Sequence, residues 1–158
     1  MEEVRIRFAT KKDSDTILSF IRLLADYECL KEEAVATLED IECSLFEKKE
    51  AEVLLLEEND IPMGFALFFH NYSTFLGKSN IYLEDLFISE QSRSKGYGRM
   101  LLQRLAEIAL ERGCERLDWA CLNWNEKSIA FYESVGAKPL SEWTTFRLDK
   151  EGLENFIK

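Results

Sequence analysis

The chain has 158 residues and a formal net charge of −10, and apolar residues make up 46% of it. This length and composition predict one folded domain, residues 1–158, with a substantial core, and they exclude a disordered chain. The acidity argues against nucleic acid or an anionic lipid surface as a partner and is compatible with a cationic small molecule, although it could serve solubility alone.

The pattern of apolar side chains predicts a mixed sequence of strands and helices. Alternation at residues 4–8 indicates a half-buried strand, and Thr37 with Asp40 forms a capping-box pattern at a helix start. Gly113 and Gly136 suit the positions that follow helix ends. In the first half we expect a strand at 4–8, a helix from about 14 to 30, a helix from Thr37, and two strands within 51–71 joined by a tight turn at Asn59-Asp60. A long strand at 80–89, a helix at 99–112 and a strand at 115–122 follow. The chain then has a short helix at 125–135, a last strand at 143–149 and a terminal helical turn. We also expect Pro62 and Gly64 to lie at an edge or a bulge, because neither suits a regular inner strand.

Several classes of protein are excluded by what the chain lacks. No apolar run approaches the roughly 20 residues that span a bilayer, and the N-terminus lacks the layout of a secretion signal. The four cysteines form no C-x-x-C pair, so we expect reduced thiols, a cytoplasmic protein and no metal. His70 is the only histidine, which gives little support to a Ser-His-Asp triad or a multi-histidine zinc site.

The stretch EQSRSKGYG, residues 90–98, lies between the long strand and an amphipathic helix. Gly96 and Gly98 would let the backbone come close to a ligand, and the first N–H groups of the helix favour an anion. Arg93, Lys95 and Arg99 add full positive charges. The pattern indicates a ligand that carries phosphates, although it could also be only a tight turn before a helix.

Two common phosphate motifs are absent. A P-loop needs G-x-x-x-x-G-K-[ST], which does not occur in the chain. A dinucleotide fingerprint needs a third glycine three residues after the second, where Leu101 stands.

The segment RSKGYG resembles the R/Q-x-x-G-x-G/A signature of the GNAT N-acetyltransferases. The segments LADYE, GFALFF, YLEDLFI and NWNEKSIAFYESVGA resemble, in order and spacing, the diamine (spermidine/spermine-type) and thialysine N-acetyltransferases within that superfamily. The resemblance implies the GNAT fold, an α/β domain whose mostly antiparallel sheet is splayed between two parallel strands, with helices on both faces. It also implies acetyl-CoA as co-substrate, a small cationic amine as the acetyl acceptor and a homodimer.

The resemblance assigns roles to particular residues of this chain. Glu84 would orient and help deprotonate the amine, and Tyr132 would protonate the departing thiolate. On a regular strand, the side chain of Asp85 would point to the face opposite that of its neighbour Glu84. The cofactor-binding residues would be Leu86, Phe87, Ile88, Arg93, Ser94, Lys95, Gly96, Tyr97, Gly98, Arg99, Asn125 and Ser128. The substrate-binding residues would be Tyr27, Glu28, Glu84, Asp118, Trp119 and Ala120.

Three functions remain open from the sequence. The first is an acetyl-CoA-dependent N-acetyltransferase that acts on a diamine, a polyamine or a lysine-like molecule in a ternary complex. The second is a protein or peptide N-acetyltransferase, and the third is an acyl-CoA-binding module without turnover. The presence of both Glu84 and Tyr132 favours an enzyme.

Overall fold

The computed structural model describes residues 2–158 and contains one five-stranded sheet in the order β1-β2-β3-β4-β5. Neighbouring strands from β1 to β4 run antiparallel, whereas β4 and β5 are parallel. The strands are β1 (Val4–Phe8), β2 (Glu52–Glu58), β3 (Ile61–Ser73), β4 (Lys78–Ile88) and β5 (Leu117–Trp119). The prediction of a mixed, mostly antiparallel sheet is confirmed.

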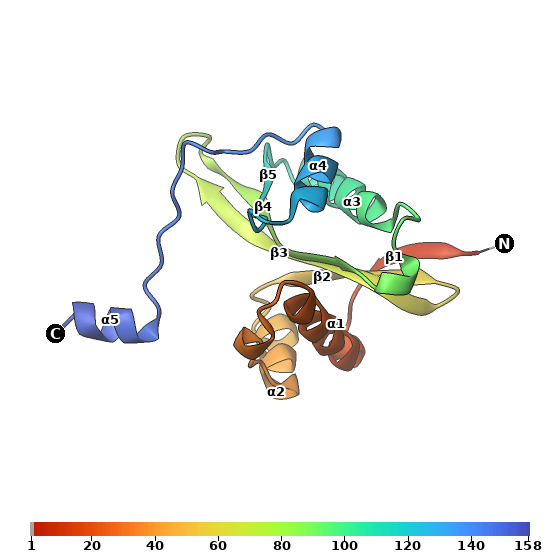
Figure 1. Cartoon of the computed structure of the whole chain (residues 1–158), viewed down its shortest axis with the longest axis horizontal. Helices are drawn as coiled ribbons and strands as arrows, with labels where there is room; N and C mark the ends of the chain where they lie inside the picture. The colour runs from red at the N-terminus through yellow and green to blue at the C-terminus, as the bar shows by residue number, and fades with distance from the viewer. Residues whose placement is uncertain (1) are drawn as a thin grey trace. The chain divides into compact units, whose positions relative to one another are not determined.

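Helices lie on both faces of this sheet, as expected. Helix α1 and helix α2 cover one face, and helix α3 covers the other (Figure 1). None of the described helices combines the length and the apolarity needed to cross a membrane. The helices are α1 (Ser14–Tyr27), α2 (Leu38–Ile41), which continues as a π-helix over Glu42–Glu47, α3 (Tyr97–Glu111), α4 (Glu126–Ser134) and α5 (Lys150–Phe156), with 3₁₀ turns at Lys11–Asp13, Lys31–Glu33 and Glu90–Ser92.

The chain forms two compact units, one that ends at Ala120 and a second over Cys121–Lys158. The first unit holds the sheet with α1, α2 and α3, and the second holds α4 and α5. All four cysteines are free thiols.

Local sequence signals account for several boundaries. The Thr37 hydroxyl accepts a hydrogen bond from the Asp40 N–H, and the Asp40 carboxylate accepts one from the Thr37 N–H, so the predicted capping box is confirmed. Asn59 and Asp60 both have positive φ, 52° and 65°, as a two-residue hairpin turn between β2 and β3 requires.

The two sides of the sheet are packed by different apolar sets. On the side of α1, Phe20 stacks on Phe65 with ring centroids 5.6 Å apart and also contacts Phe87 at 6.0 Å. From α3, Leu101 and Leu105 are completely buried. Burial of each such side chain is worth about 1.5–3 kcal/mol, so both helices are firmly held on the sheet.

A bulge in β3 lies where the sequence placed its proline and glycine. Leu56 pairs with Gly64 and Glu57 pairs with Pro62, so Met63 is the extra residue. A Cβ on Gly64 would lie 2.7 Å from the Phe87 carbonyl oxygen, a distance that no side chain tolerates. Glycine at position 64 therefore allows β3 to approach the end of β4 closely.

The parallel ladder between β4 and β5 is short. It runs from Ile81–Leu117 to Leu83–Trp119, and its entry is held by Asn80, whose side-chain oxygen accepts hydrogen bonds from two backbone N–H groups just before β5. Within residues 2–158, the remainder of β4 after Leu83 pairs with β3 alone. One edge of β4 at residues 84–88 is therefore left without a strand partner, in agreement with the predicted splaying of the sheet between two parallel strands.

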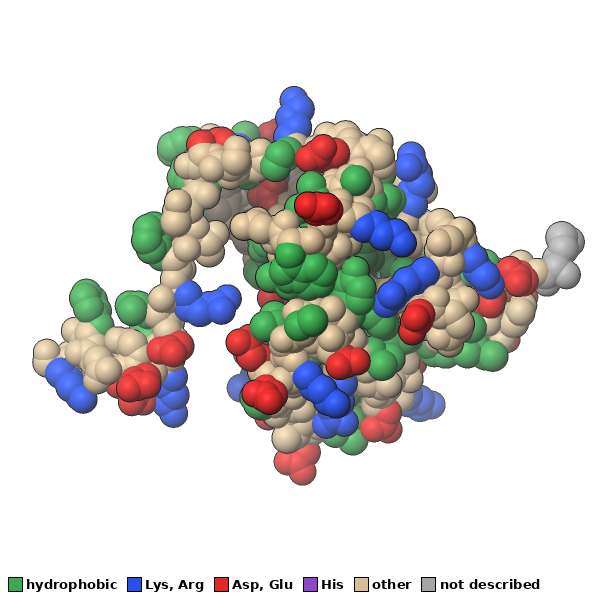
Figure 2. All heavy atoms as spheres, viewed as in Figure 1, with side chains coloured by type: hydrophobic (Ala, Val, Ile, Leu, Met, Phe, Trp, Pro, Cys, Tyr) green, Lys and Arg blue, Asp and Glu red, His purple; other side chains and the backbone are tan. Residues whose placement is uncertain are grey.

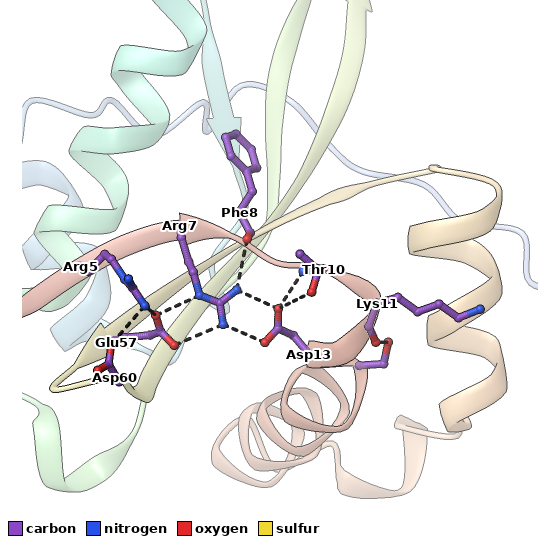
Figure 3. Close-up of polar contacts among 9 residues, drawn as sticks. Arg5, Arg7, Phe8, Thr10, Lys11, Asp13, Glu57 and Asp60 are labelled. Atoms are coloured by element: carbon purple, nitrogen blue, oxygen red, sulfur yellow. Dashed lines mark hydrogen bonds and ion pairs between the residues drawn. The ribbon is translucent and has the colours of Figure 1, made fainter.

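An ion-pair network fastens β1 to β2 and to the start of α1. Glu57 is 4% exposed and accepts hydrogen bonds from Arg5 and Arg7, and Arg7 also forms a two-pronged pair with Asp13 (Figure 3). The guanidinium of Arg7 thus lies between two carboxylates that come from different elements.

The strand predicted for residues 143–149 is not present. This segment has no regular secondary structure, and none of its backbone groups joins a strand ladder in the described chain. Trp143, Phe146 and Leu148 are exposed, and apolar side chains line this C-terminal part (Figure 2). The prediction is wrong because alternation and β-propensity indicate a strand only where another strand is available to pair with it.

Candidate active site

The loop between β4 and α3 turns the chain through two left-handed residues. Ser94 has a φ of 70° and Gly96 a φ of 82°. Gly96 is the N-cap of α3, and no side chain caps the helix there. The first N–H groups of a 15-residue helix are therefore open to a ligand, and the helix dipole favours a negative one.

The loop also leaves room for a bulky group in front of its backbone. A Cβ on Gly96 would meet no atom within 4 Å, and a Cβ on Gly98 would meet only the Ile88 side chain at 3.9 Å. Gly96 needs to be glycine for its positive φ, but the packing of the protein does not require Gly98 to lack a side chain. These residues fit the phosphates of acetyl-CoA, which approach a backbone closely.

Arg93 connects the loop to the end of α1. Its guanidinium carbon lies 4.9 Å from the centre of the Tyr27 ring and 5.5 Å from that of Phe87. Its Nε donates to the Ile88 carbonyl oxygen at 3.1 Å. Tyr27, which the sequence assigned to the amine substrate, therefore has one ring face covered by a cation of the protein itself.

The other two cations of the loop have different surroundings. The ammonium of Lys95 lies 2.9 Å from a Glu58 carboxylate oxygen, and this pairing raises the pKa of Lys95. Arg99 is exposed and forms no ion pair with any residue that the structure describes. Arg99 therefore offers a charge that no carboxylate neutralises, whereas the charge of Lys95 is already matched.

Three of the predicted cofactor-binding residues lie in the second half of β4. Leu86, Phe87 and Ile88 pair with Ala66, Phe65 and Gly64 of β3. The Phe87 side chain is 6% exposed and packs against α1, so only its backbone could meet a ligand.

Three carboxylates, Glu28, Glu84 and Asp85, influence one another electrostatically, and we call them the acidic group. Burial raises the pKa of Glu28, and the negative charge of Glu84 raises it further. Burial is also the main cause that raises the pKa of Asp85 to about 6, with smaller contributions from Glu84 and Glu28. Negative charge is thus concentrated where the end of α1 faces β4, and a cation bound there would relieve the repulsion.

A bulge in β4 explains why two adjacent residues belong to this group. Leu67 pairs with Asp85 and Phe68 pairs with Leu83, so Glu84 is the extra residue. The extra residue interrupts the alternation of side chains, and Asp85 lies on the face that carries Leu67 and α1. The expectation that Glu84 and Asp85 point to opposite faces assumed a regular strand, and the bulge at Glu84 removes that regularity.

The third predicted substrate segment is β5 and the residue after it. Asp118 pairs with Tyr82 and Trp119 pairs with Leu83, whereas Ala120 follows the strand and is exposed. Burial raises the pKa of the Tyr82 hydroxyl, and the charges of Glu84 and Asp118 raise it further. Asp118 therefore adds a fourth carboxylate that acts on the same part of β4.

The remaining predicted residues belong to the second unit. Asn125 is the N-cap of α4, and its side-chain oxygen accepts a hydrogen bond from the Ser128 N–H at 3.3 Å. Tyr132 lies in the same helix with its ring 5.5 Å from that of Phe131. Asn125 and Ser128 thus have a structural role as a helix cap, whatever else they bind.

Two residues of interest were missed or misplaced by sequence reasoning. Asp85 stood next to a predicted catalytic residue, and the unusual pair of adjacent acids in an apolar strand was a signal for a bulge. Glu58 had no signal, because its contacts with Lys95 and Tyr97 join positions 37 and 39 residues apart.

Comparison with known proteins agrees with this arrangement. Residues 18–137 match the acetyltransferase (GNAT) family, a match that covers most of the first unit and reaches into the second. The chain belongs to the GNAT acetyltransferase family and is an N-acetyltransferase. Members of this fold use acetyl-CoA.

Individual relatives lie close to the expected subgroup. The chain is 33% identical over 165 residues to the thialysine N-epsilon-acetyltransferase of Sus scrofa, covering 97% of this chain and 96% of that enzyme. It is 42% identical over 101 residues to an L-ornithine N5-acetyltransferase of Arabidopsis thaliana, covering 63% of this chain and 44% of that enzyme. Among solved structures, an integron cassette protein from Vibrio cholerae superposes with a TM-score of 0.83 at 29% identity and covers 98% of both chains.

Proposed function

We propose that this protein transfers the acetyl group of acetyl-CoA to a primary amine of a small substrate that carries a second cationic group several atoms away. Diamines, polyamines and lysine-like molecules have this chemistry. The observation that carries the proposal is the acidic group of Glu28, Glu84 and Asp85, in which burial and neighbouring negative charge raise the pKa values of Glu28 and Asp85. The names of the thialysine and ornithine enzymes support the same class of substrate.

The proposed site divides its charge between two ends. At one end, residues 93–99 offer backbone N–H groups, Arg93 and Arg99 to the pyrophosphate. At the other end, Glu28 together with Tyr27 would hold the distal cation. Asp118, Trp119 and Ala120 would line the path between the two cations.

The reaction requires a neutral amine, yet an alkylammonium with a pKa near 10 is neutral in only about one molecule in a thousand near pH 7.4. Glu84 would face the reacting nitrogen and accept its proton, directly or through a water molecule. Asp85, with its pKa raised to about 6, is a better proton acceptor than an ordinary aspartate and would share this role. Acetyl-CoA supplies an acetyl thioester whose thiolate must leave, and Tyr132 would protonate that thiolate.

The whole chain, residues 1–158, would act as one GNAT domain. We propose a homodimer by analogy with the family. Sedimentation that shows only monomer at micromolar protein concentration would contradict the dimer without affecting the proposed reaction.

The test compares 1,5-diaminopentane with pentylamine, which has the same carbon chain and one charge fewer. With acetyl-CoA and a thiol-release assay, we expect kcat/KM for pentylamine to be lower by about tenfold or more, the scale of one charge-assisted hydrogen bond. Glu28→Gln should impair the diamine more than the monoamine, whereas Glu84→Gln should slow both. Added salt should raise KM for the diamine because it screens the charge pairing.

The control is Glu32→Gln, which removes an exposed charge just beyond α1 and should change neither substrate. A monoamine that reacts as well as the diamine would contradict the two-cation model. A clear preference for lysine-containing peptides would favour a protein acetyltransferase instead. Binding of CoA without acetylation of any amine would favour the non-catalytic module.

A further inference from the structure

The last residue of β2 is tied to the cofactor loop, residues 93–99, by two side chains of that loop. One carboxylate oxygen of Glu58 accepts a hydrogen bond from Lys95 Nζ at 2.9 Å and another from the Tyr97 hydroxyl. The Glu58 side chain is only 12% exposed, and Tyr97 is buried. Lys95 also lies over the Tyr97 ring, with Nζ 5.8 Å from its centre.

Glu58 is itself held by the sheet on both sides. It pairs with Val4 of β1 and with Ile61 of β3, and the two-residue turn at Asn59-Asp60 follows it directly. The position of its carboxylate is therefore set by three strands rather than by a flexible loop.

The loop that it contacts needs such support. Ser94 has a positive φ without being glycine, a conformation that costs free energy and persists where the surroundings enforce it. Lys95 and Tyr97 stand on either side of Gly96, the second left-handed residue. Contacts to both of them restrict the turn that aims the first N–H groups of α3.

We propose that Glu58 is a positioning residue that holds the cofactor loop in the conformation that receives the pyrophosphate of acetyl-CoA. The proposal rests on the proposed function, in which this loop binds acetyl-CoA. It also assigns Lys95 to the anchoring of the loop rather than to direct contact with phosphate.

The charge of Glu58 by itself would act in the opposite direction on the binding of CoA. Its negative charge lies beside a site for a negative ligand and neutralises Lys95. If charge alone mattered, removal of that charge should strengthen the binding of CoA. If positioning dominates, the same change should weaken it.

The experiment measures the Kd for CoA by titration calorimetry and the steady-state constants with acetyl-CoA and a diamine. Glu58→Ala removes both contacts, Glu58→Gln keeps a hydrogen-bond acceptor without the charge, and Tyr97→Phe keeps the charge without the hydroxyl contact. We expect Glu58→Ala to raise Kd for CoA and KM for acetyl-CoA by about tenfold, the scale of one lost charge-assisted hydrogen bond. Glu58→Gln and Tyr97→Phe should lie between it and the wild type. The kcat at saturation and the KM for the amine should change less than twofold for the two Glu58 variants, because no reacting group is touched.

The matched control is Glu47→Gln, which removes one carboxylate from an exposed pair with Lys11 and should leave Kd for CoA unchanged. Tighter or unchanged CoA binding in folded Glu58→Ala and Tyr97→Phe would overturn the proposal, and so would an equal loss in kcat and in affinity for the amine. Wild-type protein that does not bind CoA would instead contradict the proposed function on which the inference rests.

Discussion

A buried carboxyl group with a raised pKa lowers the stability of the folded state at neutral pH, but it can serve an active site as a proton acceptor. Asp85 has an ordinary pKa of 3.8 and a folded pKa of about 6, because burial and the charges of Glu84 and Glu28 disfavour its ionised form. A raised pKa means that the folded state binds the proton more tightly than the unfolded state. The stability that this protonation contributes is therefore present at low pH and is lost as the pH rises from about 4 to 6.

Asp85→Asn should stabilise the protein above pH 6 and yet impair catalysis. The amide has no charge to desolvate, so we expect the free energy of unfolding at pH 7.5 to rise by about 1–3 kcal/mol, from a shift of roughly two pKa units. The kcat/KM for a diamine should fall by about tenfold or more because a carboxylate of the acidic group is lost. Denaturant unfolding and initial rates on the same preparations check both expectations.

The pH dependence of the stability gain in Asp85→Asn distinguishes the effect of Asp85 from that of the neighbouring carboxylates. The gain in stability should shrink toward zero near pH 4, where Asp85 of the wild type is protonated in the folded state. Asp26→Asn, at an exposed aspartate of α1, is the control and should change neither quantity. A loss of stability at pH 7.5 would mean that the Asp85 carboxylate makes a structural interaction instead.

At the scale of elements, a single buried carboxylate of β2 joins that strand to β1 and, through Arg7, to the start of α1 about 50 residues away in the sequence. Glu57 accepts hydrogen bonds from both arginines of β1, and Arg7 carries the connection onward to Asp13 at the start of α1. The guanidinium of Arg7 holds the pKa of Glu57 and that of Asp13 below their ordinary ranges. A lowered pKa contributes stability that is present above the ordinary pKa and is lost as the pH falls through the folded value.

Glu57→Gln should therefore destabilise the protein and weaken its response to acid. We expect a loss of about 1–3 kcal/mol at pH 7, because a buried hydrogen-bonded pair is broken while the arginines can still reach water. Below about pH 4 the difference from the wild type should narrow, since the wild-type carboxylate is then being protonated as well. Thermal unfolding from pH 3 to 7 measures both effects.

The same charge change at Glu47 provides the comparison. Glu47 and Lys11 form an exposed pair, with 58% and 55% of their side chains accessible, so Glu47→Gln should cost less than about 0.5 kcal/mol. Equal effects of the two substitutions would show that the Arg5–Arg7–Glu57–Asp13 network does not depend on burial.

At the scale of the whole molecule, the proposed chemistry draws on both compact units. Glu84 and the cofactor loop belong to the first unit, and Tyr132 belongs to the second. Tyr132→Phe should lower kcat by roughly 10²-fold or more while KM for acetyl-CoA changes little, because only proton delivery to the leaving thiolate is lost. Steady-state kinetics at saturating diamine measures both kcat and the KM for acetyl-CoA. An unchanged kcat in a folded variant would leave Tyr132 with a packing role beside Phe131 and would separate the second unit from the reaction.

Much of the fold followed from local patterns in the sequence. Alternation predicted β1, the Asn59-Asp60 pair predicted the tight turn, whose two residues both have positive φ, and Thr37 with Asp40 marked the start of α2. These features were predictable because each depends on residues a few positions apart. The strand predicted for residues 143–149 failed for the complementary reason, since a strand needs a partner that local propensity does not specify.

By itself, the sequence determined the family, the mixed sheet, the glycine-containing loop at the start of α3 and the acidic character of the chain. The tertiary structure alone decided which charges act together. A bulge at Glu84 interrupts the alternation of β4 beside Asp85, and Glu58, at the end of a strand, pairs with Lys95 of the cofactor loop. The physical reason is that the register of a strand and the pairing of charges depend on contacts between residues far apart in the chain, whereas helix caps, turns and loop signatures are set by near neighbours.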